Sequence, residues 1–163
     1  MPKFFAFFSF AILFALFACN RNESLVNTYI DIDADGWAQD SSVEITVMID
    51  DADLAYMAFS GIRHNPNYPY RNLYLFREVE SERGIEYRDT IYFALSDAKG
   101  VRQGSGSGHT REIVAPFGMA PFKFGERGYY TFRITQGMRP EKIPGIESVY
   151  FRLTPVKVEN KEE

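Results

Sequence analysis

The chain has 163 residues, of which 18 are Lys or Arg and 22 are Asp or Glu, so its formal net charge is −4 at pH 7. This acidic balance lacks the basic excess with which proteins bind a phosphate backbone, and it argues against a nucleic-acid-binding function. Hydrophobic residues make up 45% of the chain, enough for a single domain with a packed core. The single cysteine excludes a disulfide within the chain, so the core must be held together by packing.

The first 19 residues have the parts of a bacterial lipoprotein signal. Lys3 supplies a positive charge, and residues 4–18 are apolar with one exception. This run is shorter than the ~20 residues of a membrane-spanning helix, and it ends in a small residue, Ala18, directly before Cys19. The tetrapeptide LFAC resembles a lipobox, in which the cysteine sulfur receives diacylglycerol and the preceding peptide bond is cut. We predict a signal peptide over residues 1–18 and lipid attachment at Cys19; the alternative is an ordinary signal peptide with an incidental cysteine.

A diacylglyceryl cysteine, with a fatty acid on the new amino group, would anchor the protein to a membrane that it does not span. Two or more fatty chains hold a protein stably, since each buried methylene contributes about 0.8 kcal/mol. Asn20 follows the cysteine, where enterobacterial lipoproteins of the inner membrane carry aspartate, and this favours the outer membrane of the cell envelope. We predict a lipidated N-terminus and tether over residues 19–27, a folded domain over 28–155 and a charged C-terminal tail over 156–163.

Residues 31–36, DIDADG, imitate the start of a calcium-binding loop. Such a loop needs a bidentate glutamate at its twelfth position, and the twelfth residue counted from Asp31 is Ser42. Alternation of the aspartates with apolar residues is also typical of a solvent-exposed strand face. We therefore predict a strand here and no metal site.

Most of the remaining chain is predicted to form short strands separated by turn residues. Several segments keep their apolar side chains at every second position, as half-buried strands do. These segments are 43–49, 85–95, 130–134 and 149–153. Residues 54–62 and 72–79 are apolar at both parities, which predicts interior strands, and residues 110–114 are predicted as a short helix or an irregular segment. About seven to eight strands at this spacing predict an all-β fold, an antiparallel β-sandwich of the jelly-roll or immunoglobulin-like type.

The sequence predicts no catalytic and no metal-binding residues. The glycine-rich residues 104–109 lack the Lys-Ser/Thr of a phosphate-binding loop and the central serine of a nucleophile elbow, so they are predicted as a flexible loop. His64 and His109 are the only histidines, too few for a zinc site once Cys19 is lipidated. We predict no enzyme activity and no cofactor beyond the covalent lipid. Carboxylate pairs for glycoside hydrolysis stay open, because the sequence does not give the separation of acids.

A loop rich in proline, asparagine and tyrosine, residues 65–71, separates the two most apolar segments. Proline fixes its own φ and restricts the residue before it, so the loop should be stiff and should present Tyr68 and Tyr70 reproducibly. These tyrosines either belong to a binding surface together with Arg71, or they cap the end of the core.

Three further segments are NYPYRNLYLF (67–76), GYYTFRITQGMR (128–139) and IPGIESVYFRL (143–153). Together with the lipobox, an early Gly36-Trp37 pair and the glycine-rich loop, they resemble the gliding-motility lipoprotein GldH family of Bacteroidetes. The resemblance implies an outer-membrane lipoprotein that is needed for gliding motility, is associated with the type 9 secretion machinery and has no known enzyme activity.

Two classes of function follow. The first is a non-enzymatic accessory or assembly lipoprotein that contacts other envelope, motility or secretion proteins. Its candidate contact residues are Tyr68, Tyr70, Arg71, Gln136, Met138 and Arg139. Internal hydrogen bonds that close the sandwich would explain Gln136 and Arg139 equally well. The second class is a glycan-binding module, in which exposed rings such as Trp37 or Tyr74 stack on sugars.

Overall fold

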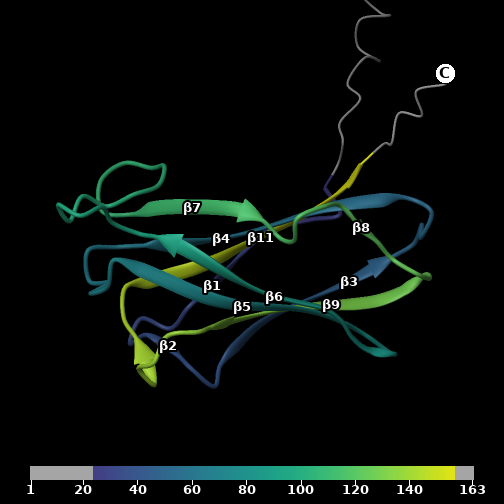
Figure 1. Cartoon of the computed structure of the whole chain (residues 1–163), viewed down its shortest axis with the longest axis horizontal. Helices are drawn as coiled ribbons and strands as arrows, with labels where there is room; N and C mark the ends of the chain where they lie inside the picture. Colours follow the sequence, from purple (N-terminus) through teal and green to yellow (C-terminus); the bar gives the residue numbers. More distant parts are fainter. Residues whose placement is uncertain (1–23, 157–163) are drawn as a thin grey trace, which may run out of the picture.

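A computed structural model describes residues 24–156, so the predicted signal peptide, Cys19 and residues 157–163 lie outside the described residues. Within them every regular element is a β-strand, which confirms the all-β prediction (Figure 1). The strands are β1 (Val26–Asp31), β2 (Trp37–Ala38), β3 (Ser42–Ile49), β4 (Ala55–His64), β5 (Asn72–Ser81), β6 (Gly84–Ala94), β7 (Arg111–Pro116), β8 (Phe122–Lys123), β9 (Gly128–Gln136), β10 (Lys142–Ile143) and β11 (Ile146–Val156). None of the described residues forms a helix that could cross a membrane.

The longer strands form two antiparallel sheets that lie face to face (Figure 1). One sheet has the order β1-β11-β4-β7, with β8 also paired to β4, and the other has the order β3-β9-β5-β6. A short ribbon of β2 and β10 completes the fold. β4 and β5 are interior strands of their sheets. This confirms the prediction from their apolar residues at both odd and even positions, that is, on both faces of each strand.

The core lies between the sheets and is built from their inward-facing side chains. On β3 every second residue is buried, which confirms the alternation predicted for residues 43–49. At the centre, Phe117, Phe132 and Phe151 are fully buried, and the rings of Phe117 and Phe132 meet edge to face with centroids 5.5 Å apart. Burial of one such side chain contributes about 1.5–3 kcal/mol to stability, so these rings are a large part of what holds the sheets together.

One charged side chain, Arg77, lies inside the sandwich. It occupies an inward-facing position on β5, between Leu75 and Val79, and its side chain is only 4% exposed. Asp89 lies directly opposite on β6. The guanidinium donates to both oxygens of the Asp89 carboxylate, at 2.7 Å from Nε and 2.5 Å from Nη2.

The same guanidinium connects the two sheets. Arg77 Nη1 donates to Ser60 Oγ on β4 at 3.0 Å and to the carbonyl oxygen of Pro116 on β7 at 2.8 Å. The guanidinium carbon also lies 4.6 Å from the centre of the Phe117 ring. Four of the five N–H groups of Arg77 therefore have an acceptor, and the desolvation of the buried charge is compensated.

Three segments differ from their predicted structure. Residues 26–27, predicted as part of the tether, belong to β1 and pair with β11. In the segment 110–114, predicted as a short helix or an irregular segment, residues 111–114 belong to β7, because pairing with β4 places Ile113 opposite Ile62 at the edge of the core. In residues 31–36 the strand β1 ends at Asp31, and a turn follows in which Gly36 N donates to the Asp33 carbonyl at 2.9 Å. Gly36 closes this turn with φ of 119°, a conformation that glycine adopts without strain.

Removal of the carboxylate that neutralises Arg77 should destabilise the fold. Asp89→Ala leaves the buried guanidinium without its counter-charge, so we expect the free energy of unfolding in a urea titration to fall by about 3 kcal/mol. Glu44→Ala removes an exposed partner of Arg133 and should cost less than about 1 kcal/mol. Equal losses for the two variants would contradict the role given to Arg77.

Candidate functional site

The N-terminal end of the domain and the loop of residues 65–71, here called the aromatic loop, lie at opposite ends of the sandwich (Figure 1). β1 begins at Val26, opposite Leu153. β4 begins nearby, opposite Val156, and runs to His64. The loop of residues 65–71 follows His64 and is therefore separated from the N-terminal end by the length of β4, about 30 Å for a strand of ten residues.

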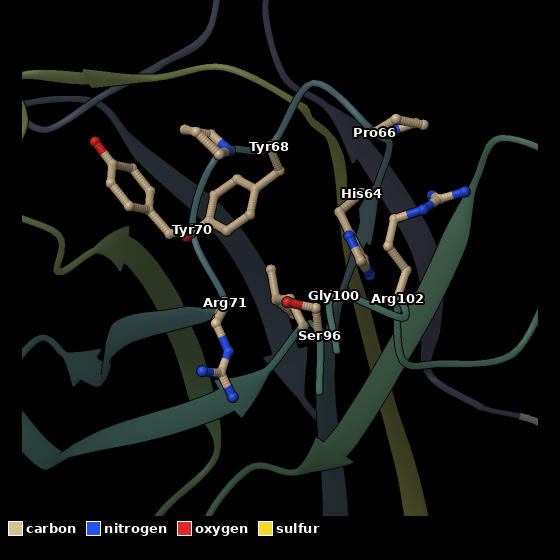
Figure 2. Close-up of a pocket in the computed structure, with 10 residues that line it drawn as sticks. His64, Pro66, Tyr68, Tyr70, Arg71, Ser96, Gly100 and Arg102 are labelled. Carbon is tan, nitrogen blue, oxygen red and sulfur yellow. The ribbon is translucent and has the colours of Figure 1, made fainter. Parts of the chain in front are cut away.

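A hollow of about 380 Å³ opens at this far end between two connections (Figure 2). One wall is the β4–β5 loop and the other is the start of the β6–β7 connection. The lining residues are His64, Pro66, Tyr68, Pro69, Tyr70, Arg71, Leu95, Ser96, Gly100 and Arg102. Two arginines and a histidine thus line the hollow together with two tyrosines, and no carboxylate is among the lining residues.

Hydrogen bonds from Asn65 hold the β4–β5 loop in place. Its side-chain oxygen accepts from Asn67 N at 2.9 Å, and its carbonyl accepts from Tyr68 N at 3.2 Å. Asn65 N donates to the Gly145 carbonyl at 2.9 Å, which joins the loop to the segment before β11. Tyr68 is buried and donates its hydroxyl to the Asn72 carbonyl at 2.7 Å. Burial raises the pKa of Tyr68, so the hydroxyl stays protonated and keeps this bond.

A carboxylate on β11 connects the two walls of the hollow. Glu147 lies where the register of β11 shifts against β4. Its Oε1 accepts from Asn65 Nδ2 at 2.9 Å, and its Oε2 accepts from Thr110 Oγ1 at 2.8 Å. Since Asn65 begins the β4–β5 loop and Thr110 ends the β6–β7 connection, this one side chain joins the two connections by hydrogen bonds.

His64 lies beside the hollow at the end of β4 and is only 1% exposed. Its Nε2 is 3.2 Å from the Gln103 carbonyl oxygen, which can only accept, so Nε2 carries the hydrogen. Burial lowers the pKa of His64, and the charges of Arg102 and Arg111 lower it further. The ring is therefore neutral near pH 7, with its hydrogen on Nε2.

Three of the six predicted contact residues come together at the hollow. Tyr68 is buried beneath the loop, so it belongs to the core, as the alternative interpretation held. Tyr70 is 38% exposed, and its ring meets that of Tyr68 edge-on with centroids 5.7 Å apart. Arg71 is exposed, and its side chain extends away from the ring of Tyr70 (Figure 2). Tyr70 and Arg71 are thus the two accessible side chains of this set.

The other three predicted contact residues do not line the hollow. Gln136 is 1% exposed, its Oε1 accepts from Met138 N at 2.7 Å, and its Nε2 donates to the Pro140 carbonyl at 3.2 Å. It closes the turn after β9 and is not available to a partner, so its assignment to a contact surface is wrong. Met138 packs against the core, and Arg139 is exposed.

The two residues predicted to stack on glycans have different environments. Trp37 is 1% exposed and donates its indole N–H to the Ser41 carbonyl at 2.9 Å, so the prediction of an exposed Trp37 ring is wrong. The β2–β10 ribbon, in which Trp37 pairs with Ile143, brings this side chain into the core. Tyr74 is 42% exposed, and its ring lies edge-on to that of Tyr92 with centroids 5.3 Å apart.

The structure does not bring the aspartates of residues 31–36 together as a group of metal ligands. Among residues 24–156 no group of three or more His, Cys, Asp or Glu side chains is placed to hold a metal ion. Asp35 instead accepts from Lys142 Nζ on β10. This hydrogen bond and the charge of Lys142 lower the pKa of Asp35.

Sequence reasoning missed Gly145 and Glu147 as organisers of the hollow. A Cβ on Gly145 would lie 2.2 Å from Tyr68 N, so only glycine lets the aromatic loop approach this closely. A signal was present, because both residues lie in IPGIESVYFRL and the loop lies in NYPYRNLYLF. Two of the segments that carry the family resemblance therefore meet at one contact.

Comparison with known proteins gives the family. A family model described as GldH lipoprotein matches residues 24–153. The chain belongs to the GldH lipoprotein family. The gliding motility lipoprotein GldH of Flavobacterium johnsoniae is 29% identical over 135 residues, which cover 82% of each chain. A GldH homologue of Christiangramia forsetii is 29% identical over 160 residues, which cover 94% of this chain and 97% of the relative.

Among solved structures, dimeric latent PorU from Porphyromonas gingivalis matches 86% of this chain and 14% of its own length. The TM-score is 0.32 and the identity is 8%, and a likeness of this size carries no functional argument.

Substitution of Gly145 should disturb the wall of the hollow. Gly145→Ala adds a Cβ against the backbone of Tyr68, whereas Gly100→Ala adds one with nothing within 4 Å. Both glycines have φ of 81°, so both variants share the backbone strain. We expect Gly145→Ala to lower the free energy of unfolding by about 1–3 kcal/mol more than Gly100→Ala, measured by urea titration. Equal losses would show that the loop moves aside without cost.

Proposed function

We propose that this GldH-family protein is a lipoprotein anchored through Cys19 in the outer membrane, where it serves as a non-enzymatic accessory or assembly component of the gliding-motility and type 9 secretion machinery. The names of the two relatives, both gliding motility lipoproteins, support the link to motility. The observation that carries the proposal is the position of Tyr70 and Arg71 at the end of the sandwich opposite the N-terminal end.

This position suits a protein that is held by its N-terminus and binds with its far end. A lipid on Cys19 keeps the N-terminal end near the bilayer, and the hollow then lies about 30 Å further out. Interfaces concentrate their binding energy in a few aromatic and Arg side chains that meet a pocket of the partner. Tyr70 and Arg71 are such side chains, and the hydrogen bonds of Asn65 and Glu147 tie the start of their loop to β11.

Loss of the two exposed side chains should abolish the native complex while the domain stays folded. Tyr70→Ala combined with Arg71→Ala removes no buried group, so we expect the melting temperature to change by only a few degrees. Cross-linking pull-down from native membranes should then recover the partners with wild type and not with the double variant. Cys19→Ala is the control that removes the anchor and leaves the far end intact. A folded double variant that still assembles would remove this surface from the mechanism.

A second candidate function, glycan binding, is favoured by an aromatic patch on the outer face of the β5–β6 pair. The patch consists of Tyr74, Phe76 and Tyr92, which are 42%, 48% and 54% exposed. Tyr74 and Tyr92 lie opposite each other in the strand register and hold their rings edge-on. Sugar rings stack on exposed aromatic faces of this kind, and no charged side chain belongs to the patch.

This candidate predicts a polysaccharide ligand whose affinity depends on the patch. In a screen of envelope polysaccharides, Tyr74→Ala combined with Tyr92→Ala should weaken binding at least about tenfold, because each stacked ring contributes on the order of 1 kcal/mol. Tyr129→Ala is a matched control, since this tyrosine is 61% exposed on β9 of the same sheet and lies outside the patch. Binding that all three tyrosines support equally would contradict a site at Tyr74.

A further inference from the structure

The end of the sandwich near the N-terminus carries a second pocket, of about 430 Å³, that the proposed function does not use. Its lining comes from β4 and β11 together with Ser24, which lies two positions before β1. Arg152 is the only charged lining residue, and Met57 and Phe59 supply apolar surface beside it. The pocket therefore has a positive charge on an apolar floor and no carboxylate of its own.

Arg152 has an unmet hydrogen-bonding requirement. Its guanidinium carbon lies 4.5 Å from the centre of the Phe59 ring, which fixes the side chain over the strand. Its Nε is buried and has no hydrogen-bond partner among the described residues. A buried donor without an acceptor is costly, and more so on a charged group. The Nε–H of Arg152 is therefore left without an acceptor among residues 24–156.

The length of chain before the domain brings this pocket to the membrane. Ser24 lines the pocket, and its Oγ lies 3.0 Å from Thr154 Oγ1, so the start of the domain is held there. Ser24 lies five positions after Cys19, and this stretch spans at most about 18 Å when fully extended. This step rests on the proposed lipid anchor at Cys19, which then keeps the pocket within that distance of the lipid headgroups.

We propose that this pocket binds the phosphate of a membrane lipid headgroup, with Arg152 as the donor. A guanidinium matches phosphate oxygens with two parallel hydrogen bonds, and phosphate is the acceptor that a bilayer surface offers in excess. Met57 and Phe59 provide apolar contact for the part of the lipid next to the headgroup. The contact would rest the N-terminal end of the sandwich on the bilayer and point the hollow with Tyr70 and Arg71 away from it.

The first test observes the unpaired Nε–H of Arg152 directly. The mature lipidated chain is placed in nanodiscs of phosphatidylethanolamine with phosphatidylglycerol, and in nanodiscs of digalactosyldiacylglycerol, which has no phosphate. The Nε–H resonance of Arg152 in ¹⁵N NMR spectra should move downfield and exchange more slowly with water only in the phospholipid discs. An Nε–H chemical shift and exchange rate that are equal in the two lipids would overturn the proposal. The acceptor would then lie elsewhere, for example in residues 157–163.

Inorganic phosphate separates a lipid headgroup from a free anion as the ligand. The full mature-length chain with Cys19→Ser, without membranes, is titrated with phosphate while the Arg152 resonance is followed. A small shift that does not saturate is expected, because the anchor no longer concentrates the headgroup at the pocket. A saturating shift with free phosphate, combined with none in phospholipid discs, would show an anion site that lipid does not occupy.

Variants test whether the contact orients the domain. With a spin-labelled headgroup lipid in the phospholipid discs, backbone amides near Met57 and Phe59 should be broadened. R152Q should reduce the population in contact with the bilayer about fivefold, the usual contribution of one cation near a lipid surface. R71Q removes the same charge at the far end and should leave the broadening unchanged. A melting curve shows whether R152Q is folded. If it is not, the comparison of the wild-type Arg152 Nε–H resonance between the two kinds of nanodisc still tests the proposal.

The failure of this inference and that of the proposed function are distinguishable. If Cys19 carries no lipid, the wild-type chain does not enter the discs. If only the partner surface is wrong, R71Q assembles normally and Arg152 still responds to phospholipid. If only the headgroup contact is wrong, R152Q and wild type show equal broadening while Tyr70 and Arg71 remain necessary for the complex.

Discussion

The buried guanidinium of Arg77 joins the two sheets by hydrogen bonds, and the packing of the domain depends on this contact. A charge between two apolar sheets is tolerated only when nearly every donor finds an acceptor. Asp89 supplies two acceptors from the neighbouring strand, while Ser60 and the Pro116 carbonyl supply two from the opposite sheet. These acceptors are correctly placed only when the two sheets are aligned. The hydrogen bonds of Arg77 therefore stabilise one relative position of the sheets.

The hollow at the far end depends on the same alignment. It is bounded by two connections that leave different sheets, and the carboxylate of Glu147 binds both of them. Gly145 lets the aromatic loop lie against the backbone before β11. Tyr70 and Arg71 are therefore presented by a loop whose position is set by strand pairing far from them in sequence, which is how a rigid sandwich can carry a reproducible surface.

The two ends of the domain have different chemistry. At the far end, exposed Tyr70 and Arg71 lie beside a neutral, buried His64. At the N-terminal end, Arg152 lies over Phe59 with an unsatisfied Nε. The strands between them are about 30 Å long, enough to keep a membrane contact and a protein contact apart. The proposed partner surface and the proposed headgroup contact thus assign separate tasks to the two ends of one rigid body.

The sequence by itself determined the all-β class, the interior positions of β4 and β5 and the family, because alternation of side chains, turn residues and short signature segments are local properties. Tertiary structure decided the rest. Trp37 and Gln136 have polar groups, yet both side chains are buried. The Ser41 carbonyl accepts from the Trp37 indole, and the turn after β9 supplies the hydrogen-bond partners of Gln136. Residues 111–114 form a strand because they pair with β4. Arg77 shares the parity of buried neighbours, but the acceptors that make its burial tolerable come from three other strands, and only the folded chain brings them together.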